Sequence, residues 1–134
     1  MAPDQDVPPA VAAWHAIAEA RDPAGLAELL ADDVVFRSPA VHGDQAGKEL
    51  TTAYLSAAVV VLGPTLVYRR QWYAERNAVL EFEAELDGLS VHGIDMLEWN
   101  DEGRLVEFTV MVRPIRGLEK LIEKMAAELF RDRS

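Results

Sequence analysis

The chain has 134 residues, of which 50% are hydrophobic and 27% are charged, a composition that predicts one globular domain rather than a fibrous or disordered chain. Its formal net charge of −10 disfavours binding to nucleic acid or to an anionic membrane surface, because like charges repel. The lack of cysteine excludes disulfides, thiolate nucleophiles and zinc–cysteine sites.

The first half of the chain has the spacing of helices with one short strand between them. Asp22 followed by Pro23 indicates a new helix start, because Asp caps free amides and Pro is tolerated in the first turn. Residues 1–9 are expected to be disordered and residues 10–134 to form a single domain. The expected elements are helices over 10–21, 22–31 and 50–61, a strand over 34–37 and a loop over 40–47.

After Gly63-Pro64 the hydrophobic period changes from helical to two, which is typical of strands. Asp87-Gly88 is a strong hairpin turn, and residues 100–103 form a second turn signal. The pattern therefore predicts an antiparallel meander followed by an amphipathic helix, in an α+β domain with helices on one face of the sheet. The expected strands are 66–73, 79–86, 89–99 and 104–112, and the last helix is 115–131.

The predicted strand 89–99 is apolar on both faces, although the helices can cover only one of them. The second apolar face is expected to contact another copy of the chain, so the sequence predicts a homodimer formed through the sheet. The N-terminus has no basic stretch followed by an apolar core, and the longest apolar run, 57–62, is too short to cross a bilayer. These features predict a cytoplasmic protein with no membrane partner.

The segment SVHGIDMLEW places Asp95 in the same strand row as Val91, Leu97 and Trp99, because side chains alternate between faces. A buried carboxylate without a partner is costly, so this group is expected to accept hydrogen bonds, to pair with a cation, or to remain protonated through a raised pKa. Each outcome implies a different role.

Three stretches resemble the SnoaL-like, nuclear transport factor 2-like superfamily, which includes ketosteroid isomerases and polyketide cyclases. They are WHAIAEARDPAGLAELLADDVVFRSP, GKELTTAYL and GIDMLEWNDEGRLVEF, and the resemblance covers residues 10 to 112. It implies a cone-shaped α+β barrel in which helices pack in the concavity of a strongly curved antiparallel or mixed sheet around an apolar pocket, here with an added C-terminal helix.

The resemblance to ketosteroid isomerase also implies roles for four residues. Asp95 corresponds to the aspartic acid that an apolar site keeps neutral, so that it donates a hydrogen bond to the substrate oxygen. Trp14 stands where the isomerase has an oxyanion-hole tyrosine, and Tyr54 corresponds to a second pocket tyrosine. Ser38 replaces the aspartate base, and an unassisted hydroxyl has too little proton affinity to take over that role.

Each of these four residues also has an interpretation in which it contacts no ligand. Asp95 could be a structural acceptor bonded to Trp14, Tyr54 or a backbone amide. Trp14 is more often core filling, Tyr54 fits core and pocket about equally, and Ser38 before Pro39 is typical of a turn.

The remaining candidates are less specific. His42 could act as a base at the pocket mouth, and Phe36 is expected to line the pocket. Arg113 could pair with Asp95 or an acidic ligand, or else cap the last helix or pair with Glu107. The histidines are scattered without metal-ligand spacing, so no metal and no cofactor are expected.

The sequence therefore predicts a protein that binds a small hydrophobic molecule carrying an oxygen function. One hypothesis is an acid–base enzyme of the isomerase, cyclase or hydrolase kind, with Asp95 as donor and Ser38 or His42 assisting. Alternatives are a protein that binds a metabolite without catalysis, or a homodimeric interaction module.

Overall fold

The structure is a computed structural model that describes residues 7–40 and 43–131. Residues 1–6 of the segment expected to be disordered lie outside this described part, and the first helix begins at Pro9. The helices are α1 (Pro9–Ala20), the 3₁₀ turn η1 (Pro23–Gly25), α2 (Leu26–Leu29), α3 (Lys48–Leu62) and α4 (Ile115–Arg131). The strands are β1 (Leu30–Arg37), β2 (Gln45–Ala46), β3 (Val67–Tyr73), β4 (Asn77–Leu86), β5 (Leu89–Trp99) and β6 (Leu105–Arg113).

The strands form one mixed sheet in the order β2-β1-β6-β5-β4-β3. Strands β3 to β6 are the antiparallel meander expected from the sequence, whereas β1 lies parallel to β6, with Phe36 opposite Phe108. β1 begins earlier than expected because Leu30 is fully buried opposite Leu105. The expected loop 40–47 contains the short strand β2, which pairs with β1.

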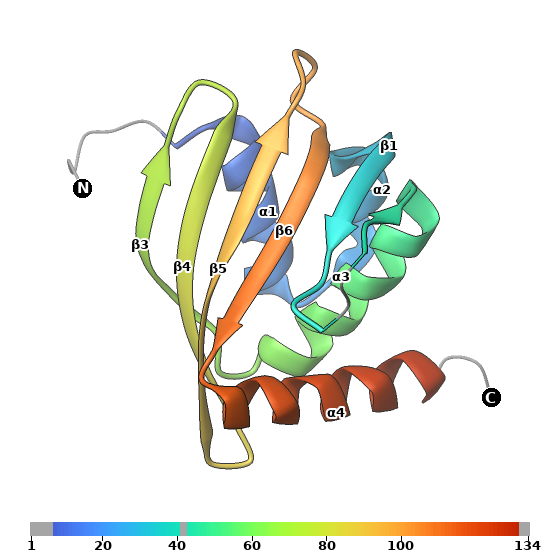
Figure 1. Ribbon diagram of the computed structural model, residues 1–134. Coiled ribbons are helices and arrows are strands. Elements are labelled where there is room, and N and C mark those ends of the chain that lie inside the picture. The colour runs from blue at the N-terminus through green and yellow to red at the C-terminus, as the bar shows by residue number, and fades with distance from the viewer. Residues whose placement is uncertain (1–6, 41–42, 132–134) are drawn as a thin grey trace.

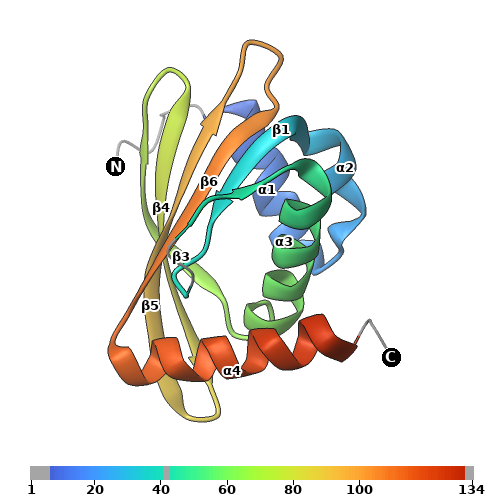
Figure 2. The same ribbon diagram turned by 45° about the vertical axis from the view of Figure 1, so that its right-hand side comes forward.

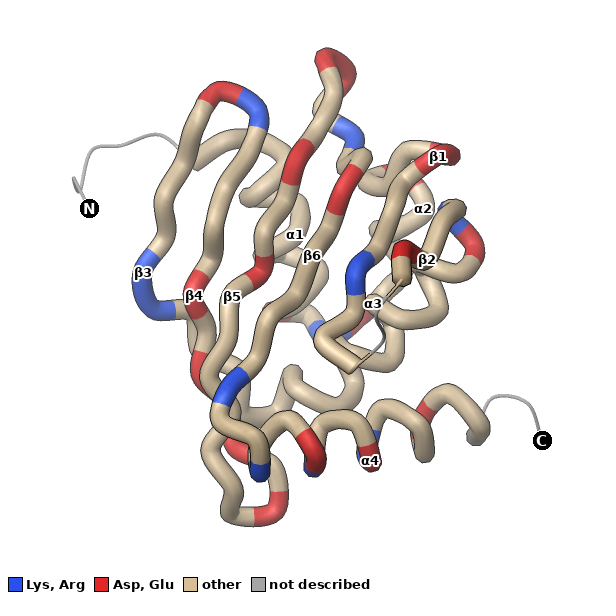
Figure 3. The backbone as a smooth tube through the Cα atoms, in the orientation of Figure 1, with Lys and Arg blue, Asp and Glu red and all other residues tan. Residues whose placement is uncertain are grey.

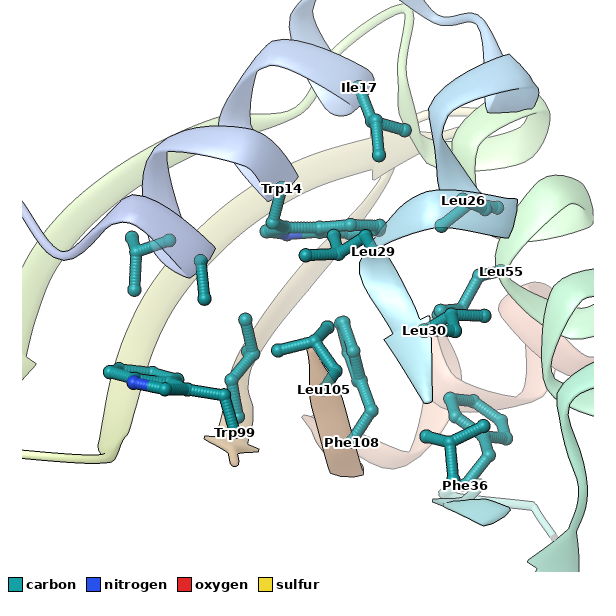
Figure 4. Packing of buried hydrophobic residues seen from close by; sticks show 14 of the residues in the cluster. Trp14, Ile17, Leu26, Leu29, Leu30, Phe36, Leu55, Trp99, Leu105 and Phe108 are labelled. Atoms are coloured by element: carbon teal, nitrogen blue, oxygen red, sulfur yellow. The ribbon is translucent and has the colours of Figure 1, made fainter. Parts of the chain in front are cut away.

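The helices enclose the concave face of the sheet. Figures 1 and 2 show α1, α2 and α3 against this face, and α4 running across the end of the barrel beneath α3. Trp14 of α1 meets Phe108 of β6 edge to face in the main core, with ring centroids 5.0 Å apart (Figure 4). A second core cluster under α4 brings Leu121 against Phe82 and Val91. The fold is thus the cone-shaped α+β barrel that the sequence resemblance implies.

Gly93 lets two parts of the barrel wall approach closely beside Asp95. A Cβ atom at this position would lie 2.4 Å from the carbonyl oxygen of Met111 and 2.7 Å from Cζ of Phe82. Real Cβ atoms do not tolerate such distances, so only glycine allows the Phe82 ring to lie over β5. The Phe82 ring can therefore form part of the wall next to Asp95.

The surface carries mixed charges. Figure 3 shows acidic positions along β4, β5, β6 and α4, with basic positions between them. Within residues 7–40 and 43–131, no helix is both long and apolar enough to cross a membrane.

Candidate functional site

Asp95 lies on the inner face of β5, in the middle of the barrel wall. It stands between Leu80 of β4 and Val110 of β6 in the strand register, and only 6% of its surface is exposed. The neighbouring outward residues of the strand, Ile94 and Met96, point to the opposite face. The carboxyl group is therefore placed inside the barrel, among apolar side chains.

A chain of hydrogen bonds connects α1, β3 and β5. The indole Nε1–H of Trp14 donates to the hydroxyl of Tyr68 at 2.7 Å, and this hydroxyl donates to Oδ2 of Asp95 at 2.6 Å. Because an indole N–H can only donate, the Tyr68 oxygen is the acceptor of the first bond, and the hydrogen of its hydroxyl is directed to Asp95 in the second. Burial, and then the adjacent Asp95, raise the pKa of Tyr68 well above its usual value, so the phenol keeps this hydrogen.

Asp95 is held partly protonated near neutral pH. Burial raises its pKa to about 7, although the hydrogen bond from Tyr68 and the nearby indole of Trp14 lower it. Oδ2 accepts a hydrogen bond from Tyr68, and Oδ1 is the carboxyl oxygen that takes no part in this bond. The acidic hydrogen therefore belongs on Oδ1, where it is free to be donated to another molecule.

A small apolar cavity lies beside this carboxyl group. Its volume is about 40 Å³, room for only a few water-sized atoms. The lining residues come from both helices and strands; they include Trp14, Leu55, Tyr68, Phe82, Asp95 and Phe108. This space, called the Asp95 cavity below, is too small to hold a ring system unless the surrounding side chains move or only one end of the ligand enters.

Ser38 and Tyr54 line a different cavity. This second cavity, called the α4 cavity below, has a volume of about 150 Å³ and lies under α4, between the end of β1 and α3. Its wall includes Leu121 and Met125. Phe36 lines this α4 cavity and the Asp95 cavity as well, and its ring stacks on Tyr54 with centroids 5.4 Å apart. The expectation that Ser38 and Tyr54 would share a pocket with Asp95 is thus not met here, because the Phe36 ring stands between them.

Ser38 also has a local partner. Its hydroxyl accepts a hydrogen bond from the amide of Ala40 at 3.1 Å, an ST-turn of the kind that the sequence indicates.

Arg113 is not near Asp95 in the described structure. Arg113 lies opposite His92 on the outer face of the sheet, with its Nη1 3.4 Å from Nδ1 of His92, so it cannot pair with Asp95. Glu107 bonds to Arg37 instead of Arg113. His42 lies outside the described residues. Within the described ranges, no three His, Asp or Glu side chains converge as a metal site would require.

Tyr68 is the site residue that the sequence interpretation missed. It belongs to the predicted strand 66–73, but the pairing of this strand shifts between Tyr68 and Gln71, which breaks the simple alternation of faces. If Leu66 and Tyr68 are both assigned to the face of this strand that points into the barrel, the tyrosine becomes a candidate partner for the buried acid.

A comparison with models of known protein families identifies the family of this chain. A model of the SnoaL-like domain matches residues 11–108, which is most of the chain. The chain belongs to the SnoaL-like family. A search of curated proteins found no match to this SnoaL-like protein.

Several solved structures resemble this SnoaL-like protein. A steroid delta-isomerase from Pseudomonas aeruginosa is 39% identical with a TM-score of 0.86, over 91% of this chain and 90% of that one. An uncharacterised protein with a cystatin-like fold from Silicibacter pomeroyi is 27% identical with a TM-score of 0.84, over 92% and 86%. A nuclear transport factor 2-like protein from Mesorhizobium loti is 24% identical with a TM-score of 0.69, over 78% and 88%, and shares the fold.

Proposed function

We propose that this SnoaL-like protein binds a small, mostly apolar molecule through one oxygen atom and acts on it as an acid–base enzyme of the isomerase, cyclase or hydrolase kind. The observation that carries the proposal is the buried acid of Asp95, which lines an apolar cavity and whose Oδ1 is not the oxygen that Tyr68 contacts. A neutral acid in such surroundings donates a strong hydrogen bond to a carbonyl oxygen, and more so when negative charge develops on that oxygen. The similarity to a steroid delta-isomerase supports the same chemistry.

A second candidate function is binding without catalysis. It is favoured by Ser38, which stands where the isomerases have their aspartate base and whose hydroxyl is engaged with the Ala40 amide. An anchor without a base is sufficient for a protein that sequesters or senses a metabolite.

The anchoring role of Asp95 predicts a pH-dependent affinity for a ligand that can only accept hydrogen bonds. With 2-tetralone, a compact bicyclic ketone, we expect the affinity of the wild type to fall as the pH rises above about 7, since the ionised carboxylate no longer donates. The decline approaches about tenfold per pH unit. In Asp95→Asn the affinity is expected to be independent of pH, because an amide donates in both ranges. Calorimetric titration between pH 5 and 9 measures both curves.

The control for this experiment is Asp33→Asn, which removes an exposed acid of β1. It is expected to keep the wild-type pH profile. A wild-type affinity that does not change across this range, or no saturable binding at all, would contradict the anchoring role of Asp95.

We also propose that the protein forms a homodimer through the outer face of the sheet. Large apolar side chains on this face are exposed in the single chain; Trp72 is 51%, Met96 38% and Met111 53% exposed. Ion pairs such as Arg70–Glu81 lie on the same face. An apolar centre with polar groups around it is typical of a two-fold protein interface.

The dimer proposal predicts a solution mass of twice the 14.8 kDa chain. Met111→Glu would bury two charges at the centre of the interface, so this variant is expected to be monomeric. Light scattering on a sizing column measures the mass. Ile122→Glu is the matched control, because Ile122 is exposed on α4 and not on the sheet. A monomeric wild type, or a dimer disrupted by the α4 variant alone, would overturn this proposal.

A further inference from the structure

The outer face of the sheet carries opposite charges at the two ends of the strand pair β5 and β6. Near the turn that joins these strands, Glu98 stands opposite Glu107, and at the far end His92 stands opposite Arg113. Because side chains alternate along a strand and Asp95 points inward, these four side chains point outward. Figure 3 shows acidic positions toward the turn and a basic position at the far end of β6. The two pairs are called the acidic end and the basic end below.

Each end borders a hollow in the outer face. The hollow at the acidic end has a volume of about 320 Å³, and Met96 and Thr109 line it together with both acids. The hollow at the basic end has a volume of about 250 Å³, and Ile94 and Met111 line it together with both basic residues. The apolar centre of the outer face therefore lies between two hollows whose rims carry opposite charges.

One charge at each end is not balanced within the chain. Glu107 accepts a hydrogen bond from Arg37 at 2.5 Å, so a cation of the same chain faces this acid. Nη1 of Arg113 lies 3.4 Å from Nδ1 of His92, which is not an anion. Among residues 7–40 and 43–131, neither Glu98 nor Arg113 forms an ion pair, and both are exposed. An acid and a cation thus remain available to a second molecule on this face.

The two ends are arranged symmetrically along the strands. Asp95 and Val110 are opposite one another in the register, and each end lies three residues away from this level. At about 3.4 Å per residue, each end is about 10 Å from it. A two-fold axis that crosses the strands at this level would place the acidic end of one copy over the basic end of the other. An axis along the strands would place acidic end over acidic end, which like-charge repulsion disfavours.

We propose that two copies of the chain pack face to face with their strands in opposite directions, so that Arg113 of each copy contacts the acidic end of the other. The inference rests on the proposed homodimer and adds its orientation and the residues that select it. Ile94, Met96 and Met111 then meet their counterparts near the axis and supply the apolar contact area. The charges at the two ends select the direction more than they add affinity, because exposed ion pairs contribute little energy.

The test reverses these charges one at a time and together. Arg113→Glu places an acid against the acidic end twice, by symmetry, and Glu98→Arg places a cation against the basic end twice. Each single variant is expected to raise the dissociation constant of the dimer at least about tenfold. The double variant Glu98→Arg/Arg113→Glu exchanges the two charges and is expected to return the dissociation constant close to the wild-type value. Sedimentation velocity over a dilution series at low salt measures all four proteins.

Arg116→Glu and Glu119→Arg are the matched controls, because both residues are exposed on α4 and the changes in net charge are the same. Both variants are expected to dimerise as the wild type does. A Glu98→Arg dimer that is tighter than the wild type would mean that the strands run in the same direction, which overturns the proposed orientation. Single reversals without effect, or a double variant as weak as the single ones, would also overturn the orientation and leave the homodimer standing. A monomeric wild type overturns both.

Discussion

Replacement of Asp95 by asparagine is expected to stabilise the protein at pH 8 and to change its stability little at pH 4. The pKa of Asp95 is about 7 in the folded protein and near 3.8 when the group is unburied. Between these values the folded state binds more protons than the unfolded state, so this group makes the wild type less stable as the pH rises from about 4 to 7. At about 1.4 kcal/mol per pH unit, the total effect reaches up to about 4 kcal/mol.

The measurement is urea unfolding of the wild type and of Asp95→Asn at several pH values from 4 to 8. The side-chain oxygen of asparagine can still accept the hydrogen bond from Tyr68, so the variant removes the ionisation and keeps the partner. Asp33→Asn reports the effect of removing an exposed acid and is expected to show no such trend. A difference between wild type and Asp95→Asn that is the same at pH 4 and pH 8 would mean that Asp95 is not a neutral acid in the folded protein.

The elements of the fold that depend on local chemistry could be predicted from the sequence. The Asp87-Gly88 hairpin is one example: both residues adopt positive φ angles, of 50° and 82°, which Asp tolerates and Gly adopts freely. The amphipathic spacing of the last helix is another. Such signals lie within a few residues of one another, so they are visible without the tertiary structure.

The parallel pairing of β1 with β6 has no comparable local signal. Leu30 and Leu105 are opposite one another although they are far apart in the chain. Neither the β-branched residues of β1 nor those of β6 specify this partner or its direction, because hydrophobic strands pair in many ways. Only the resemblance to a known family implied a cone-shaped barrel.

The candidate site was predictable in its central residue and not in its surroundings. Asp95 stands out because a lone acid in an apolar row requires an explanation, and the structure places it beside a cavity. Its partner Tyr68 comes from another strand, after a register shift that hides which face it occupies. The separation of Ser38 and Tyr54 from Asp95 depends on how one ring, that of Phe36, packs. Rotamer packing of this kind is set by all neighbouring elements together.

The position of Phe36 between two cavities leads to a further expected result. Phe36→Ala is expected to lower the free energy of unfolding by about 3–5 kcal/mol, because the ring is 97% buried and its loss leaves an empty volume. The same change joins the Asp95 cavity of about 40 Å³ to the α4 cavity of about 150 Å³. We therefore expect this variant to bind the elongated ketone 4-phenylcyclohexanone at least about tenfold more tightly than the wild type does, since the added phenyl group fills new space at about 25 cal/mol per Å².

Phe82→Ala separates the effect of joining the cavities from that of simple truncation. Phe82 is 1% exposed and lines the Asp95 cavity, but it does not line the α4 cavity. Its loss is expected to destabilise the protein by a similar amount without extending the cavity toward α4. Urea unfolding gives the stability of both variants, and calorimetric titration gives their affinity for the elongated ketone. Equal gains in affinity would mean that Phe36 does not form the barrier, because either truncation would then admit the longer ligand.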